Sequence, residues 1–181
     1  MIWPIAGILT VTFTWVGLLF LVKRWPGDSS MTFSQHAAQT SSAQLYYAVM
    51  WSLALPPFVS FIIYGVYDRL SLPSIFIPLV IAASTLMLVA AYVPEIGGWK
   101  TTIHRLAAFS MATLFLPIVV LIALSGELSA VGRVVTVPIA MYMAWQIVFL
   151  TVVKRQHPKM LYLQGSYIAL FQVAIVAGSI F

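Results

Sequence analysis

The sequence predicts an all-α fold: a polytopic membrane bundle of six transmembrane helices that forms one domain over residues 1–181. The chain is 62% hydrophobic and only 7% charged, whereas a soluble domain carries about 25% charged residues. Its mean hydropathy is +1.02. Six apolar runs approach the roughly 20 residues that cross a hydrocarbon core of about 30 Å, and short polar segments separate them. Such a chain cannot cover a water-facing surface, so we expect it in a bilayer.

The first three spans are expected at 3–22, 44–66 and 74–93. The first ends at a pair of basic residues, and the polar segment after it contains Pro26, which stops a helix together with the glycine that follows. A charged pair closes the second span. Pro73 then suits the first turn of the third helix, where a missing N–H costs nothing.

A polar connector over residues 94–102 leads to the fourth span. Its glycine pair predicts a turn, and Thr101 or Thr102 is expected to cap the next helix, because a threonine hydroxyl can accept a bond from a free backbone N–H. The last three spans are expected at 103–124, 134–153 and 161–181.

The distribution of lysine and arginine predicts the orientation in the cell membrane. Loops two and four hold only Arg69 and Arg133, each near an acid. Cytoplasmic loops are enriched in basic residues, so loops one, three and five are expected in the cytoplasm and both termini outside. These three loops hold Lys23, Arg24, Lys100, Arg105, Lys154, Arg155 and Lys159.

Several functional classes are disfavoured by what the spans lack. No Asp, Glu, Lys or Arg lies deep in any predicted span, which argues against a pump or a voltage sensor. The basic residues flank apolar runs, where they anchor helices, so no nucleic-acid partner is expected. The chain has no cysteine, which excludes disulfides and thiolate metal sites.

The second span carries a semi-polar row, which consists of Ser52, Pro56, Ser60, Tyr64 and Asp68. Residues four apart lie on one face of a helix. The two central prolines remove backbone donors and are expected to kink the helix. The row has two readings: Ser52, Ser60 and Tyr64 line a ligand cavity, or they pack against neighbouring helices.

Two glutamines inside later spans are further ligand-binding candidates. Gln146 lies in the fifth span and Gln172 in the sixth, where Gln164 also lies. A buried amide in lipid needs partners. These side chains are expected to bond neighbouring helices, with a ligand head group as the alternative.

The three histidines form the sharpest chemical hypothesis. His36, His104 and His157 fall in loops one, three and five, with Glu95 on the same predicted side. Three imidazoles could hold Zn²⁺ with one open position and activate water. The alternative is that the histidines are ordinary interfacial residues, with His104 a helix-start residue that binds backbone or lipid phosphate. Ser34, His104 and Glu95 are the catalytic candidates on the hydrolase reading.

Two passages carry a resemblance to a known family. The polar first loop has a serine before the second span, and a proline and an acid precede a histidine that leads into an Ala-rich fourth span. With six spans, this pattern resembles the DUF998 group of small prokaryotic membrane proteins, which is similar to the Frag1/DRAM type of six-helix protein. Gln35 stands where the resembled pattern has an acid. The resemblance implies no established function, and implies a common site formed by Ser34, Pro94, Glu95 and His104.

The sequence thus favours an integral membrane protein that binds a lipid or a membrane-protein partner within its helix bundle. The alternative is a membrane-embedded, metal-dependent lipid hydrolase that uses the loop histidines. A small transporter is the third choice, because the spans lack ionisable residues. Whether the protein is an enzyme is left open at this point.

Overall fold

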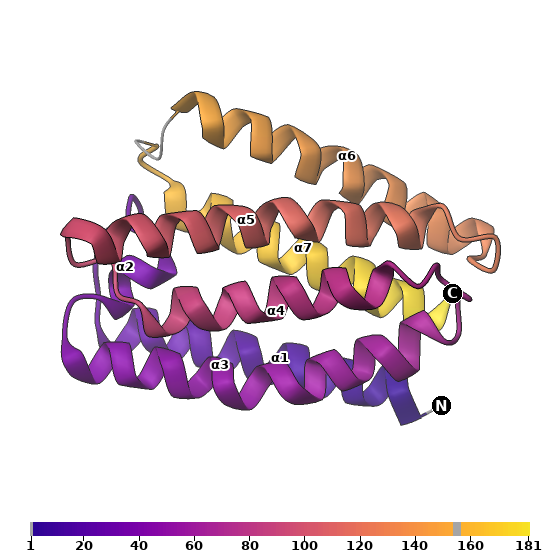
Figure 1. The fold of residues 1–181 in the computed structure, drawn as a ribbon, viewed down its shortest axis with the longest axis horizontal. Coiled ribbons are helices and arrows are strands. Elements are labelled where there is room, and N and C mark those ends of the chain that lie inside the picture. The colour runs from indigo at the N-terminus through magenta and orange to yellow at the C-terminus, as the bar shows by residue number, and fades with distance from the viewer. Residues whose placement is uncertain (1, 154–156) are drawn as a thin grey trace.

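The computed structural model describes residues 2–153 and 157–181, and over these ranges the fold is all-helical (Figure 1). The predicted all-α class is therefore confirmed. The elements are α1 (Ile2–Arg24), α2 (Phe33–Ala37), α3 (Ser41–Ile62), the π-helical turn η1 (Ile63–Tyr67), α4 (Phe76–Tyr92), α5 (Gly98–Ala123), α6 (Ala130–Val153) and α7 (Met160–Ile180).

Five helices are long and apolar enough to cross a membrane: α1, α3 with η1, α5, α6 and α7. The sixth apolar helix, α4, is shorter at 17 residues. These helices support a multi-pass membrane protein, as the composition predicts.

Two local expectations need correction. The fourth span does not begin after a threonine cap: α5 begins at Gly98, and Gly97, with a φ of 99°, is its N-cap. Thr101 lies inside the first turn, where its hydroxyl accepts a bond from the Gly97 N–H at 2.6 Å. The glycine pair therefore starts the helix itself, because glycine adopts a positive φ without strain.

The second correction concerns loop one, which contains a short helix that the sequence reading missed. Thr32 caps α2 and forms a capping box with Gln35, in which each side chain bonds the other residue's backbone N–H. Four of the five residues of α2 are buried. Loop one thus contains a short helix that packs against the bundle.

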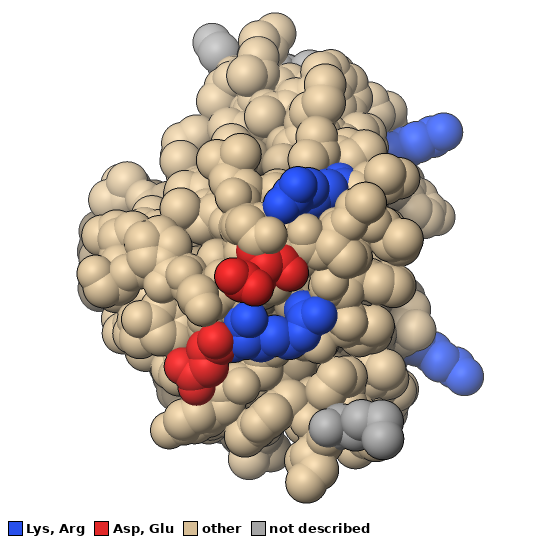
Figure 2. Space-filling model, turned by 90° about the vertical axis from the view of Figure 1, so that its right-hand side faces the viewer, with Lys and Arg blue, Asp and Glu red and all other residues tan. Residues whose placement is uncertain are grey.

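The long helices run alternately in opposite directions (Figure 1). Loop one, the α4–α5 connector, the C-terminal end of α6 and the start of α7 gather at one end, which we call the loop end. Both described chain ends and the other two turns lie at the opposite end. Figure 2 shows that opposite end, where a few acidic and basic side chains group on a largely uncharged face. There Arg69 donates to the carbonyl oxygens of Gly178 and Ile180, which satisfies the last carbonyls of α7.

The core lies between α3, α4, α5 and α7, and α1 packs on α3 and α7. Helix α1 approaches α3 closely because it presents Gly7 and Gly17 there: a Cβ on Gly7 would lie 2.3 Å from the Phe61 ring. Small residues permit this contact in membranes, where lipid supplies no hydrophobic force between helices.

Helix α6 is the peripheral helix of the bundle. In an 18-residue apolar stretch of α6, 22% is buried, whereas the corresponding stretches of α3 and α7 are 50% buried. It contacts α5 and α7, and Figure 1 shows it diverging from α5 towards the loop end. That divergence positions the cavity described below.

Candidate functional site

The α4–α5 connector brings two of the predicted site residues together. His104 is buried, and its Nδ1 lies 2.8 Å from the Val93 carbonyl oxygen. Its Nε2 lies 4.0 Å from a carboxylate oxygen of Glu95, and both side chains are nearly inaccessible, at 2% and 3% exposed. Arg105, which is 56% exposed, donates to the other Glu95 oxygen at 2.7 Å. We call this cluster the connector corner.

The connector corner ties the loop to the first turns of α5. A carboxylate held by an arginine is a strong charge-assisted contact, and the Val93 carbonyl fixes the plane of the imidazole. The resemblance-based grouping of Glu95 with His104 therefore matches a real contact. The connector corner can hold a proton carrier in position, and the same contacts also make it a structural link between the connector and α5.

The third catalytic candidate, Ser34, is placed differently. Its hydroxyl is buried on α2 and pairs with the Thr32 hydroxyl at 2.9 Å. Among the described residues no hydrogen bond joins Ser34 to His104. Since a nucleophile needs a base within hydrogen-bond reach, the structure does not assemble these residues into a catalytic pair.

The hypothesised zinc site on the three histidines is not assembled in the described part of the chain. Among the described residues, no group of three or more His, Asp or Glu side chains is placed to hold a metal ion. His36 is fully buried in loop one with Nδ1 3.0 Å from the Trp25 carbonyl oxygen, while His157 packs on Phe149 of α6 and accepts from the Lys159 backbone N–H. The three imidazole rings lie at the same end of the bundle, but each one bonds a backbone group of its own segment.

Among the described residues, Ser52, Ser60 and Tyr64 of the semi-polar row line neither of the two bundle cavities described below. Ser60 and Tyr64 are exposed on the outer surface, and Tyr64 stacks on Trp3. Ser52 bonds the Ala48 carbonyl and the Tyr92 hydroxyl. Inward-facing positions of α3 are taken by larger apolar groups such as Trp51 and Phe58, so Ser60 and Tyr64 face outward.

The two glutamine candidates bond neighbouring helices. Gln146 is fully buried, and its Nε2 donates to the Leu163 carbonyl and the Ser166 hydroxyl of α7. Gln172 accepts a bond from Trp15 Nε1 of α1 at 2.8 Å. Both amides thus form the bonds between helices that the sequence analysis prefers for them.

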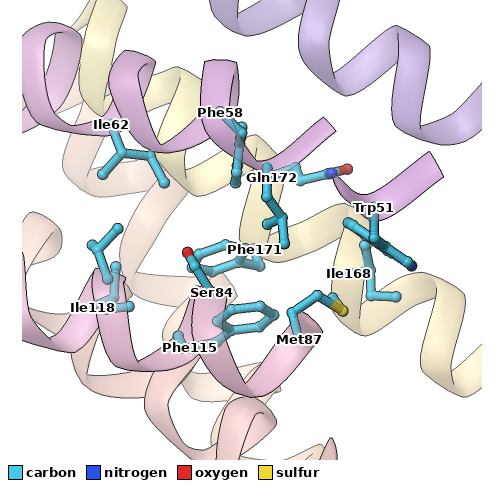
Figure 3. Close-up of a pocket in the computed structure, with 13 residues that line it drawn as sticks. Trp51, Phe58, Ile62, Ser84, Met87, Phe115, Ile118, Ile168, Phe171 and Gln172 are labelled. Carbon is cyan, nitrogen blue, oxygen red and sulfur yellow. The ribbon is translucent and has the colours of Figure 1, made fainter. Parts of the chain in front are cut away.

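A small cavity of about 30 Å³ lies in the core between α3, α4, α5 and α7 (Figure 3). Its walls are almost entirely apolar, and the Phe115 and Phe171 rings stack at its centre with centroids 3.8 Å apart. Figure 3 shows the Gln172 amide turned away from these rings, so only its stem contributes to the wall. This space exceeds the minimum for one water but offers no set of polar partners to hold it.

A larger cavity, of about 120 Å³, lies between α5, α6 and α7 near the loop end. We call it the lateral cavity. It reaches the lipid-facing surface, because one of its wall residues, Phe109, is 45% exposed. Phe115 and Ile168 line both cavities and separate the lateral cavity from the core. The remaining wall residues are Thr32, Ala108, Met111, Ala112, Ile147, Leu150, Met160, Gln164 and Tyr167.

The polar groups of the lateral cavity come mainly from its loop-end rim. Gln164 Oε1 accepts the Phe33 backbone N–H at 2.8 Å, which joins α7 to loop one. Tyr167 donates to the Ala112 carbonyl deeper in the wall, so its hydroxyl is already used. The structure thus presents an apolar slot with a polar mouth.

Gln164 is the site residue that sequence reasoning did not single out. Its only signal is an amide inside an apolar run, and Gln146 and Gln172 carry the same signal. Its distinction depends on the divergence of α6, which no local pattern encodes.

Comparison with family models, with curated proteins and with solved structures finds no match to this chain.

Proposed function

We propose that this protein is a six-span membrane protein that binds an acyl chain of a membrane lipid in the lateral cavity. The cavity itself is the observation that supports the proposal: it is apolar, it opens sideways, and its polar groups gather at one end. Ligand sites in helix bundles typically combine apolar walls with a few such polar groups.

The length of the lateral cavity along α7 matches the depth of one leaflet. Its wall on α7 extends from Met160 to Ile168, which at 1.5 Å per residue is about 12 Å. One leaflet contributes about half of a 30 Å hydrocarbon core. A chain that enters between α5 and α6 therefore remains at the depth it occupies in the bilayer and exchanges one apolar environment for another.

The diverging helix supports entry from the side. Trp145, Val148 and Val152 are exposed on α6, which fits a helix surrounded by lipid. Because α6 has the least buried window of the five candidate spans, displacing it costs fewer contacts than displacing α3 or α7. Lateral exchange through α6 follows from this difference.

The proposal counts α4 as the sixth span. Seventeen residues lie at the lower limit for crossing a hydrocarbon core, and apolar residues flank α4 on both sides. We place loops one, three and five in the cytoplasm and both termini outside, as the basic residues predict. The DUF998-like pattern of Ser34, Pro94, Glu95 and His104 then faces the cytoplasm.

Filling the lateral cavity tests the proposed function. Ala108→Trp places an indole in the slot, and Leu106→Trp is the matched control because Leu106, on the same helix, is 66% exposed. Both proteins are purified in mild detergent, incubated with phospholipid and examined by native mass spectrometry. We expect bound lipid on wild type and on Leu106→Trp but not on Ala108→Trp; equal lipid on both variants refutes the site.

The orientation has its own test, made simple by the absence of cysteine. Ser30→Cys and Gly126→Cys add single thiols at exposed positions of opposite ends. A membrane-impermeant maleimide applied to intact cells is expected to label only Gly126→Cys. Labelling of Ser30→Cys alone would invert the orientation, and labelling of both would contradict the alternating spans.

A further inference from the structure

We infer that the lateral cavity selects an anionic phospholipid from the leaflet at the loop end, with the lipid's phosphate–ester region bound by Gln164 and attracted by Lys159. This inference rests on the proposed function and adds the class of lipid and the residues that recognise it. It is argued from the hydrogen-bonding groups at the rim and from the charge of the loop end.

The rim offers hydrogen-bond donors. Gln164 Oε1 is occupied by the Phe33 N–H, while its Nε2 has no hydrogen-bond partner among the described residues. A carboxamide nitrogen carries two N–H donors. A side chain held by its oxygen at the mouth of an apolar slot therefore keeps two donors for a ligand.

The hydroxyl pair beside Gln164 adds a further donor. Thr32 lines the cavity, and its oxygen accepts from the Gln35 N–H and pairs with the Ser34 hydroxyl. When Ser34 donates within the pair, the Thr32 hydroxyl proton is left for a ligand in the cavity. The rim is thus rich in donors, so its complement is a group rich in acceptors, such as an ester carbonyl or a phosphate.

The charge of the loop end selects among acceptor-rich head groups. The described residues of its loops and adjoining helix ends include five cations against two acids, Asp28 and Glu95. Arg105 is committed to Glu95. Lys159 is exposed and directly precedes Met160 of the cavity wall. Each basic residue near a membrane surface attracts anionic lipid. The five cations are Lys23, Arg24, Lys100, Arg105 and Lys159.

The helix direction acts with these charges. Helix α7 begins at Met160, at the mouth of the cavity, and the N-terminal end of a helix carries a partial positive charge. Among the first N–H groups of α7, that of Leu161 is already used by the Ser29 carbonyl. The dipole therefore contributes to the field at the mouth, while Gln164 supplies the directed bonds.

Two lipids with identical chains separate head-group selection from chain binding. Full-length protein is delipidated in detergent and titrated with dioleoylphosphatidylglycerol or dioleoylphosphatidylcholine, with native mass spectrometry reporting bound lipid. We expect wild type to bind the anionic lipid at least fivefold more tightly. Preference for the anionic lipid supports the inference, whereas equal affinities refute it and leave the proposed function intact. Absence of binding for both lipids refutes the proposed function itself.

Gln164→Glu is the informative variant. It retains an oxygen acceptor for the Phe33 N–H, so loop one keeps its anchor, but it replaces the two donors by negative charge. We expect affinity for phosphatidylglycerol to fall at least tenfold, since a bond to a charged group is lost and repulsion is added. Unchanged selectivity in this variant overturns the assignment of Gln164.

Lys159→Gln removes one positive charge and so isolates the electrostatic contribution of Lys159 to lipid affinity. Because Lys159 is exposed, this substitution is compatible with folding. The expected loss is about fivefold for the anionic lipid and little for the zwitterionic one. Lys100→Gln is the matched control, because Lys100 carries the same charge at the same end but lies beside Trp99 in α5. Equal losses in both variants would show a general surface effect and overturn the assignment of Lys159.

Discussion

Replacing Gly7 by alanine should destabilise the bundle, although alanine is the better helix former. The added Cβ would lie 2.3 Å from the tip of the Phe61 ring and within 2.7 Å of its two neighbouring carbons, whereas ordinary contacts begin near 3.4 Å. Phe61 is fully buried, so the ring must withdraw by about 1 Å into occupied space. Overpacking of this kind costs about 1–3 kcal/mol.

The control for this prediction is a second helical glycine with room for a methyl group. A Cβ on Gly165 in α7 would have its nearest neighbour at 3.7 Å. Gly165→Ala is therefore expected to stabilise the protein by up to about 1 kcal/mol, the difference in helix propensity. The two substitutions are chemically identical, so the difference in their unfolding free energies reports the contact with Phe61.

The assay is unfolding in mixed detergent micelles with increasing dodecyl sulfate, followed by the fluorescence of the six tryptophans. Gly7→Ala should unfold at lower denaturant than wild type. In a Phe61→Leu background the effect of Gly7→Ala should shrink, with a coupling of about 1 kcal/mol or more. Equal shifts for Gly7→Ala and Gly165→Ala would refute the close packing of α1 on α3.

Three further predictions use the same preparation. Arg69→Ala removes both bonds to the Gly178 and Ile180 carbonyls and should cost about 1 kcal/mol of unfolding free energy; a stability equal to that of Lys23→Ala would contradict this. Gln146→Leu deletes the amide link to α7 and should cost about 0.6 kcal/mol, the average for hydrogen bonds between membrane helices; a gain in stability would count against the link. Bonds from the Ser30 hydroxyl and backbone N–H lower the pKa of Asp28 below its ordinary value of 3.8, so its contribution to loop-one stability is complete above pH 3.8 and is lost as pH falls through the lower folded pKa. The Ser30 amide resonance should then titrate with a midpoint below 3.8 and stop titrating there in Asp28→Asn, and a midpoint at or above 3.8 would refute the contact.

The sequence alone could not show whether Ser34 and His104 lie in contact. A shared role requires contact, and contact depends on how loop one folds. The capping box of Thr32 and Gln35 turns that loop into a helix that buries Ser34 against Thr32. The DUF998-like pattern has an acid at position 35, but this chain has a glutamine there, and its side chain forms part of this cap. Glu95 and His104 meet, in contrast, because only a short connector and fewer than two helical turns separate them.

The residue sequence by itself determined that this protein is helical and belongs in a bilayer. Runs of apolar side chains leave no other way to satisfy the backbone, because lipid offers no hydrogen-bonding partners and a helix satisfies its own groups. The positions of the runs follow equally directly. Five of the six appear as helices long enough to span, and the sixth appears as the shorter α4.

Only the tertiary structure decided which side chains meet. A serine can face lipid when its hydroxyl bonds a carbonyl of its own helix, as Ser60 bonds Pro56, and lipid does not drive apolar faces together. Periodicity therefore does not tell which face turns inward. Packing of Trp51 and Phe58 turned the Ser60 and Tyr64 face of α3 outward. The divergence of α6, set by contacts among three helices, then placed Gln164 at the mouth of a cavity.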